Sequence, residues 1–88
     1  MGWFVYMLRC GDGSLYTGCT DDVMRRLEVH KRGKGGKYTR SHLPVELAYW
    51  EETQDKSTAL RREMAIKSLS RQQKLALIET YKDTQQHP

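Results

Sequence analysis

Residues 3–20, WFVYMLRCGDGSLYTGCT, predict two strands joined by a tight turn. Residues 3–10 are apolar at nearly every position, which is typical of a central strand covered on both faces. Residues 11–13 (GDG) form the turn, and a loop of this kind commonly ends in a left-handed residue, a conformation that Gly13 adopts without steric cost. We therefore expect a β-hairpin over this stretch.

The length of the turn decides which side chains share a face. A three-residue turn places Leu8 opposite Tyr16, and Tyr6 becomes a diagonal neighbour on the same face, roughly 7–8 Å away. A two-residue turn would put the two tyrosines on opposite faces. The hairpin should thus present two phenols side by side.

A helix is predicted after the hairpin, ending at about Arg32. Thr20 can cap it, and the two aspartates that follow suit the positive end of the helix dipole. Arg26 borders the sheet-facing stripe, while Arg25 faces water, and His30 shares the edge on which Arg26 lies. The buried stripe should comprise Val23, Met24 and Leu27.

Residues 31–44 read as an irregular loop, and residues 45–50 (VELAYW) as a third strand that begins after a proline. A second helix should cover residues 56–69, with Ala59 and Ile66 on its buried face. Glu63 falls about 40° from Ala59 on the helical wheel.

A carboxylate on a buried stripe requires a cation, a metal or a hydrogen-bond network, because burying an unpaired charge is strongly unfavourable. Glu63 is therefore a candidate metal ligand. The structural alternative is an ion pair with Arg26 or Arg62.

Ser70 and Gln73 have the form of a capping box for a short third helix. Its apolar side would comprise Leu75, Leu77, Ile78 and Tyr81. We expect one domain over residues 1–82 and a frayed tail over residues 83–88. Three strands and three helices around one core make a compact α/β (α+β) sandwich.

The positive charge is concentrated in one segment. The 88 residues include 15 Lys and Arg against 11 Asp and Glu, and residues 31–42 contain five of these bases and no acid. The rest of the chain has ten bases and eleven acids, so the basic segment points to a polyanion such as nucleic acid. A solvated basic loop is the alternative.

Cys10 and Cys19 have no spacing that completes a zinc site, and we read both as buried, reduced thiols. No signal-peptide pattern and no apolar run of about 18 residues is present, so we expect a soluble cytoplasmic protein without membrane association. A length of 88 residues suits one small domain and is too short for a second, separate recognition domain, so any target selection must come from this fold or from a partner.

Three motifs resemble the GIY-YIG nuclease superfamily: residues 4–6 (FVY), residues 16–18 (YTG) and Arg26, ten residues after the second tyrosine. The resemblance extends over about residues 3–69. Residues 16–30 look like the core of the small stand-alone bacterial members and of the Slx1-type structure-specific endonucleases. It implies a helix-flanked, three-stranded antiparallel sheet and a metal-dependent nuclease.

The sequence departs from the family pattern at Phe4, in place of a glycine, and at Thr17, in place of an isoleucine, while Gly18 of the motif is kept. The chemically active positions match. The catalytic set carried over is Tyr6, Tyr16, Arg26, His30 and Glu63.

By this resemblance Tyr16 takes a proton from the attacking water, with Tyr6 beside it to position or share that proton. Arg26 should bind the scissile phosphate through its planar fork. Donation to the same phosphate, orientation of Tyr6 and structural packing all remain open for His30. Glu63 should be the only protein ligand of one hydrated Mg²⁺ or Mn²⁺.

The basic segment supplies the candidate nucleic-acid contacts: Lys34, Lys37, Tyr38, Thr39 and Arg40. Its three glycines, Gly33, Gly35 and Gly36, would allow close approach of backbone to phosphate. We expect a monomeric DNA endonuclease acting on branches, flaps or nicks in repair or recombination, with DNA favoured over RNA and a protein partner able to select targets. The alternatives are a non-catalytic nucleic-acid-binding module and a regulatory protein that docks on a DNA-repair enzyme.

Overall fold

The computed structural model describes the backbone of residues 2–86 and the side chains of residues 2–80. Its elements, in chain order, are the strands and helices β1 (Trp3–Cys10), β2 (Leu15–Thr20), α1 (Val23–Lys31), α2 (Lys37–Ser41), β3 (Val45–Thr53), α3 (Lys56–Lys67) and α4 (Arg71–Gln86). The strands form one antiparallel sheet in the order β2-β1-β3. The expected α+β class and the central position of β1 are confirmed.

The hairpin has the predicted register. Leu8 pairs with Tyr16, Tyr6 pairs with Gly18, and Gly13 has a φ of 85°. Because facing residues of antiparallel strands project to the same side, both tyrosines lie on one face of the sheet.

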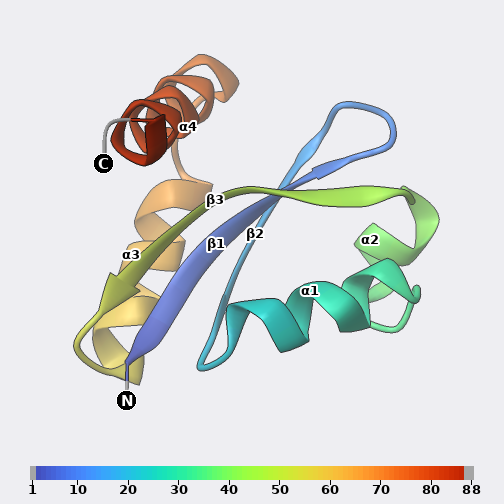
Figure 1. Cartoon of the computed structure of the whole chain (residues 1–88), viewed down its shortest axis with the longest axis horizontal. Coiled ribbons are helices and arrows are strands. Elements are labelled where there is room, and N and C mark those ends of the chain that lie inside the picture. Colours follow the sequence, from blue (N-terminus) through green and yellow to red (C-terminus); the bar gives the residue numbers. More distant parts are fainter. Residues whose placement is uncertain (1, 87–88) are drawn as a thin grey trace.

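Successive side chains of β1 point to opposite faces of the sheet, so the protein has two hydrophobic cores, one on each face (Figure 1). The face covered by α1 buries Tyr6, Leu8, Cys10, Leu27 and Val45. The face covered by α3 and α4 buries Val5, Met7, Tyr49, Ala59, Ile66 and Ile78. The expectation of a central strand buried on both sides is correct, because helices cover both faces of the sheet.

Two expectations for α1 are wrong. Asp22, not Thr20, is the N-cap, and its carboxylate accepts a hydrogen bond from the Arg25 backbone N–H. Thr20 instead ends β2, so the helix starts at Val23. Met24 is 67 % exposed, so it does not belong to the buried stripe.

The segment expected to be an irregular loop contains the short helix α2. Strand β3 extends to Thr53, three residues beyond the predicted end, and α3 ends at Lys67. The predicted capping box forms: the Ser70 backbone N–H donates to Gln73 Oε1, and the Gln73 N–H donates to Ser70 Oγ.

Helix α4 continues to Gln86, so the backbone stays helical past the boundary expected at residue 82. The side chain of Tyr81 and the tail residues 87–88 lie outside the described part. Within residues 2–86, none of the helices has the length and apolar character needed to span a bilayer.

Candidate active site

A polar pocket of about 340 Å³ opens where β1, β2, α1 and α3 meet. Four of the five predicted catalytic residues line this polar pocket: Tyr6, Tyr16, Arg26 and Glu63. Gly18, Cys19 and Asp21 also line it. Side chains from four elements therefore converge on one concave surface.

His30, the fifth residue, lies behind the pocket and is fully buried. Its Nε2 is 3.0 Å from Tyr6 Oη, and its Nδ1 is 2.8 Å from Thr39 Oγ1. Thr39 is also fully buried, so the expectation that its hydroxyl contacts nucleic acid is wrong. The hydroxyl instead orients the imidazole from the side opposite Tyr6.

The Gly36 carbonyl can only accept a hydrogen bond, and this sets the direction of the bonds along the chain Gly36, Thr39, His30 and Tyr6. The Thr39 hydroxyl donates to the Gly36 carbonyl at 3.5 Å, which leaves its oxygen to accept from His30 Nδ1–H. His30 Nε2 then accepts the phenol proton of Tyr6. Burial, followed by the charge of Arg26, lowers the pKa of His30, so the ring is held in its neutral form.

Tyr6 is almost fully buried, and burial raises its pKa to about 12, against the opposing effect of Arg26. The phenol therefore stays protonated, with its proton on the His30 side. Gly18 packs directly against this ring: a Cβ at that position would lie 2.7 Å from Tyr6 Oη. The glycine of the motif is required by this close approach.

Arg26 is anchored by the segment that precedes α2. Its Nη2 donates to the Gly35 carbonyl at 2.8 Å, and the side chain lines the polar pocket. Gly35 is buried, and a Cβ there would collide with the His30 ring. The expected role of Gly35 in approaching phosphate is therefore wrong. Its backbone instead packs against His30 and accepts the hydrogen bond from Arg26.

Glu63 pairs with Lys67 rather than with either arginine that the sequence suggested. Glu63 Oε2 is 2.6 Å from Lys67 Nζ, and the Glu63 side chain is 16 % exposed. Arg62 instead binds Glu51 at 2.8 Å. Sequence reasoning missed Lys67, although a spacing of four residues on one helix was a sufficient signal.

Cys19 is a second missed neighbour of this carboxylate. Burial, and then a hydrogen bond to Glu63, raises the pKa of the Cys19 thiol to about 11. Both cysteines are free thiols, as predicted, but Cys19 is only half-buried because it lines the polar pocket.

Comparison with known proteins agrees with this geometry. A model of the GIY-YIG catalytic domain matches residues 2–76. The chain belongs to this family. Membership in the GIY-YIG family implies nuclease activity and, with it, nucleic-acid binding.

Small bacterial proteins with the same domain are close in sequence. The UPF0213 protein of Streptococcus agalactiae is 50 % identical over 82 residues, which cover 93 % of each chain. That of Staphylococcus aureus is 55 % identical over 75 residues, 85 % of this chain and 92 % of its own. The solution NMR structure of the UPF0213 protein BH0048 from Bacillus halodurans is 45 % identical, covers 91 % of this chain and 85 % of its own, and has a TM-score of 0.59.

The polar pocket contains few groups that can bind a metal ion. Among the described side chains, no cluster of three or more His, Cys, Asp or Glu is arranged to hold one. Glu63 and Asp21 are the carboxylates that line the polar pocket. This small number of donors suits a cation that keeps most of its water ligands, as Mg²⁺ does. It does not suit a metal ion that is held by protein ligands alone.

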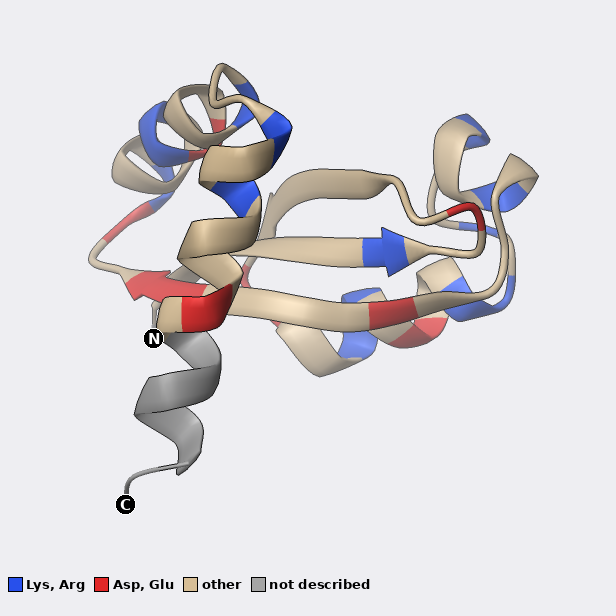
Figure 2. Cartoon of the chain, turned by 90° about the horizontal axis from the view of Figure 1, so that it is seen from above, with Lys and Arg blue, Asp and Glu red and all other residues tan. Residues whose placement is uncertain are grey.

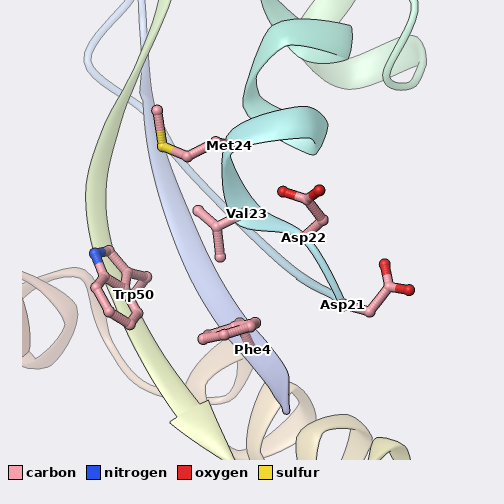
Figure 3. A pocket seen from close by; sticks show the side chains of 6 residues that line it. All are labelled: Phe4, Asp21, Asp22, Val23, Met24 and Trp50. Atoms are coloured by element: carbon pink, nitrogen blue, oxygen red, sulfur yellow. The ribbon is translucent and has the colours of Figure 1, made fainter. Parts of the chain in front are cut away.

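A second, apolar pocket of about 310 Å³ lies beside the N-terminus of α1. Figure 3 shows Phe4 and Trp50 of the sheet beside Val23 and Met24 of the helix. The rings of Phe4 and Trp50 meet edge to face at 5.7 Å. Asp21 and Asp22 also line this apolar pocket, but none of the described Lys, Arg or His side chains does, so it offers no cation for a phosphate. The polar pocket, which Arg26 lines, is therefore the candidate active site.

The basic segment, residues 31–42, forms the surface around the end of α1 and α2. Figure 2 shows these basic residues at the end of the sheet opposite the N-terminus. Lys34, Lys37 and Arg40 are exposed. Tyr38 is 43 % exposed and stacks on His42, with ring centroids 4.3 Å apart. These four side chains are open to solvent, unlike Thr39.

Proposed function

We propose that this protein is a divalent-metal-dependent endonuclease that hydrolyses phosphodiester bonds in DNA at branches, flaps or nicks, in repair or recombination. The observation that supports it best is the convergence of two phenols, a guanidinium and a carboxylate in one polar pocket. These groups can stabilise the charge that develops on phosphate, accept a proton and hold a cation.

Arg26 binds the scissile phosphate. Its bond to the Gly35 carbonyl holds the guanidinium at the wall of the polar pocket, and the planar fork of a guanidinium matches the geometry of phosphate oxygens. Because charge on those oxygens grows as the nucleophile attacks, this contact strengthens in the transition state.

Acting in its phenolate form, Tyr16 accepts the proton of the attacking water and becomes a neutral phenol, and Tyr6 orients that water. Tyr6 donates a hydrogen bond to His30 Nε2 and keeps its proton, so its oxygen can accept a hydrogen bond from the pocket side. The rings of Tyr6 and Tyr16 are 6.5 Å apart, which allows both phenols to face one water between them. His30 and Thr39 act by positioning Tyr6.

Glu63 is the protein ligand for one hydrated Mg²⁺ or Mn²⁺, which when bound would polarise the phosphate and stabilise the leaving oxygen. To bind it, Glu63 must exchange its ion pair with Lys67 for the metal. Lys67 is 54 % exposed at its side chain and is therefore free to turn toward phosphate.

The decisive experiment is Glu63→Gln, which removes the charge and keeps the shape. Cleavage of a labelled panel of duplex, nicked, flap and four-way-junction DNA, with Mg²⁺ or Mn²⁺, should be abolished, while DNA affinity stays within about twofold. Lys67→Gln is the matched control, because it frees Glu63 without removing the carboxylate. Full metal-dependent cleavage by folded Glu63→Gln protein would remove Glu63 from the mechanism and favour a non-catalytic DNA-binding module.

The basic segment supplies affinity through phosphate contacts. Changing Lys34, Lys37 and Arg40 together to Ala should reduce the slope of log affinity against log salt by about 2 to 3, near 0.9 for each lost contact. An unchanged slope would place the DNA elsewhere. Absence of any salt-dependent binding by the unchanged protein would favour a docking protein over a nuclease.

A further inference from the structure

We infer that a groove next to the polar pocket binds one unpaired nucleotide that flanks the scissile phosphate; this inference rests on the proposed nuclease function. The groove has a volume of about 300 Å³, in the range of small-ligand pockets. We call it the Tyr38 groove, and it is lined by Leu15, Tyr16, Thr17, Tyr38, Lys67 and Lys74.

The Tyr38 groove is continuous with the candidate active site. Tyr16 lines both depressions, and Lys67, which lines the groove, is bonded to Glu63 of the polar pocket. Strand β2, an edge strand of the sheet, lines both depressions. A nucleic-acid strand leaving the active site across this edge would enter the groove at the next nucleotide.

One side of the groove is suited to phosphate. Lys67 of α3 and Lys74 of α4 both line it, so two cations from different helices face the same space. The edge strand also presents outward backbone groups that are free of sheet pairing. A phosphate here would compete with Glu63 for Lys67, and binding of the nucleotide would therefore release Glu63 for the metal.

The other side of the groove is suited to a base. The Tyr38 ring stacks on His42 at 4.3 Å and lies nearly parallel to the ring of Tyr16, with centroids 6.2 Å apart. Contact with two neighbouring rings holds Tyr38 in place, and its exposure of 43 % leaves part of the side chain open to a base. Bases stack on such platforms with little dependence on sequence, and only an unpaired base exposes its face for this.

A third observation concerns the groove wall at Thr17. Its hydroxyl oxygen is buried and, within the described part of the chain, has no hydrogen-bond partner. An unsatisfied buried hydroxyl is unfavourable. A ligand oxygen or an ordered water in the groove would supply the missing partner after a small shift of the side chain.

The test compares Tyr38→Ala and Lys74→Gln with Arg71→Gln, which removes one charge from the same helix outside the groove. Affinity is measured by fluorescence anisotropy, without a catalytic metal, for a duplex with a single-stranded overhang and for a blunt duplex with equal phosphates. Tyr38→Ala should weaken overhang binding by about fivefold or more, with less than twofold loss for the blunt duplex. Tyr38→Phe, which keeps the ring, should bind as the unchanged protein does.

Lys74→Gln should lower the salt slope for the overhang by about 0.7, the value for one single-strand contact, whereas Arg71→Gln should leave it unchanged. Overhangs of DNA and of RNA show which sugar the groove accepts. If Tyr38→Ala lost equal affinity for blunt and overhang duplexes, or if the salt slope of Lys74→Gln equalled that of Arg71→Gln, the nucleotide groove would be refuted. The proposed nuclease function would not be affected by either result. Failure of the unchanged protein to bind either duplex would refute the proposed function as well.

Discussion

Two buried tyrosines, Tyr6 and Tyr49, lie on opposite faces of the sheet. Burial raises the pKa of each phenol to about 12. Tyr6 is hydrogen-bonded to neutral His30, while Tyr49 donates to the carboxylate of Glu51, which Arg62 binds in turn. The two networks are therefore alike in burial and in the ionisation of the phenol.

The two networks differ in what lies beside them. Tyr6 faces the polar pocket together with Arg26, whereas Tyr49 belongs to the apolar core under α3 and α4 and lines neither that pocket nor the Tyr38 groove. A shifted phenol pKa therefore reports burial. Access to a pocket lined by Arg26, the proposed phosphate ligand, distinguishes the network that we assign to catalysis.

The strongest test of this comparison uses one arginine from each network. Arg26→Ala should lower kcat/KM by about 100- to 1000-fold, as loss of a donor to developing charge does, and should also weaken DNA binding. Arg62→Ala should leave cleavage within about twofold and lower the free energy of unfolding by about 1 kcal/mol, a small cost because its side chain is 40 % exposed. Cleavage assays measure kcat/KM, and urea denaturation measures the free energy of unfolding. Equal losses of activity in the two variants would show that the Tyr6 and Tyr49 networks do not differ in function.

Alkaline titration tests the likeness of the two phenols. Unfolded tyrosine ionises near pH 10, while Tyr6 and Tyr49 ionise near 12 in the folded protein. The unfolded state therefore loses its protons first, and the free energy of unfolding should fall between pH 10 and 12, by on the order of 2 kcal/mol for each tyrosine. Tyr6→Phe and Tyr49→Phe should each remove the contribution of one tyrosine to this decrease in the free energy of unfolding. If the decrease is as large in a variant as in the unchanged protein, the phenol removed in that variant is exposed.

A smaller effect is expected for Thr39, which belongs to the Tyr6 network alone. Thr39→Val leaves the buried Nδ1–H of His30 without an acceptor, which costs about 1–2 kcal/mol of stability. Cleavage should fall about tenfold with an altered pH profile, because His30 can then change tautomer. Thr39→Ser should restore both the rate and the profile. Normal kinetics in Thr39→Val would make this threonine a packing residue only.

The smallest expected change is a gain in stability at Thr17, opposite in sign to the others. Thr17→Val replaces a buried hydroxyl that lacks a partner with a methyl group of similar size. We expect the free energy of unfolding to rise by about 1 kcal/mol, measured by thermal and urea denaturation. A loss of stability would show that the hydroxyl is satisfied in solution.

Local sequence was sufficient to predict the hairpin and the position of its two tyrosines. Strand pattern, turn length and the glycine at the end of the turn act over a few residues, so they specify the register without help from the rest of the fold. The buried face of α3 was equally readable, because Ala59, Glu63 and Ile66 repeat with the helical period. These parts place three of the five candidate catalytic side chains: Tyr6, Tyr16 and Glu63.

Helix α2 and its contacts could not be read from local sequence. Residues 37–41 lack an apolar repeat, and their first residue follows three glycines within four positions, which favours a loop. Burial of Thr39 depends on this segment folding back over His30, nine residues away, and Gly35 reaches Arg26 over the same separation. The partner of a buried polar group is chosen by packing between elements, and a periodic pattern carries no information about that packing.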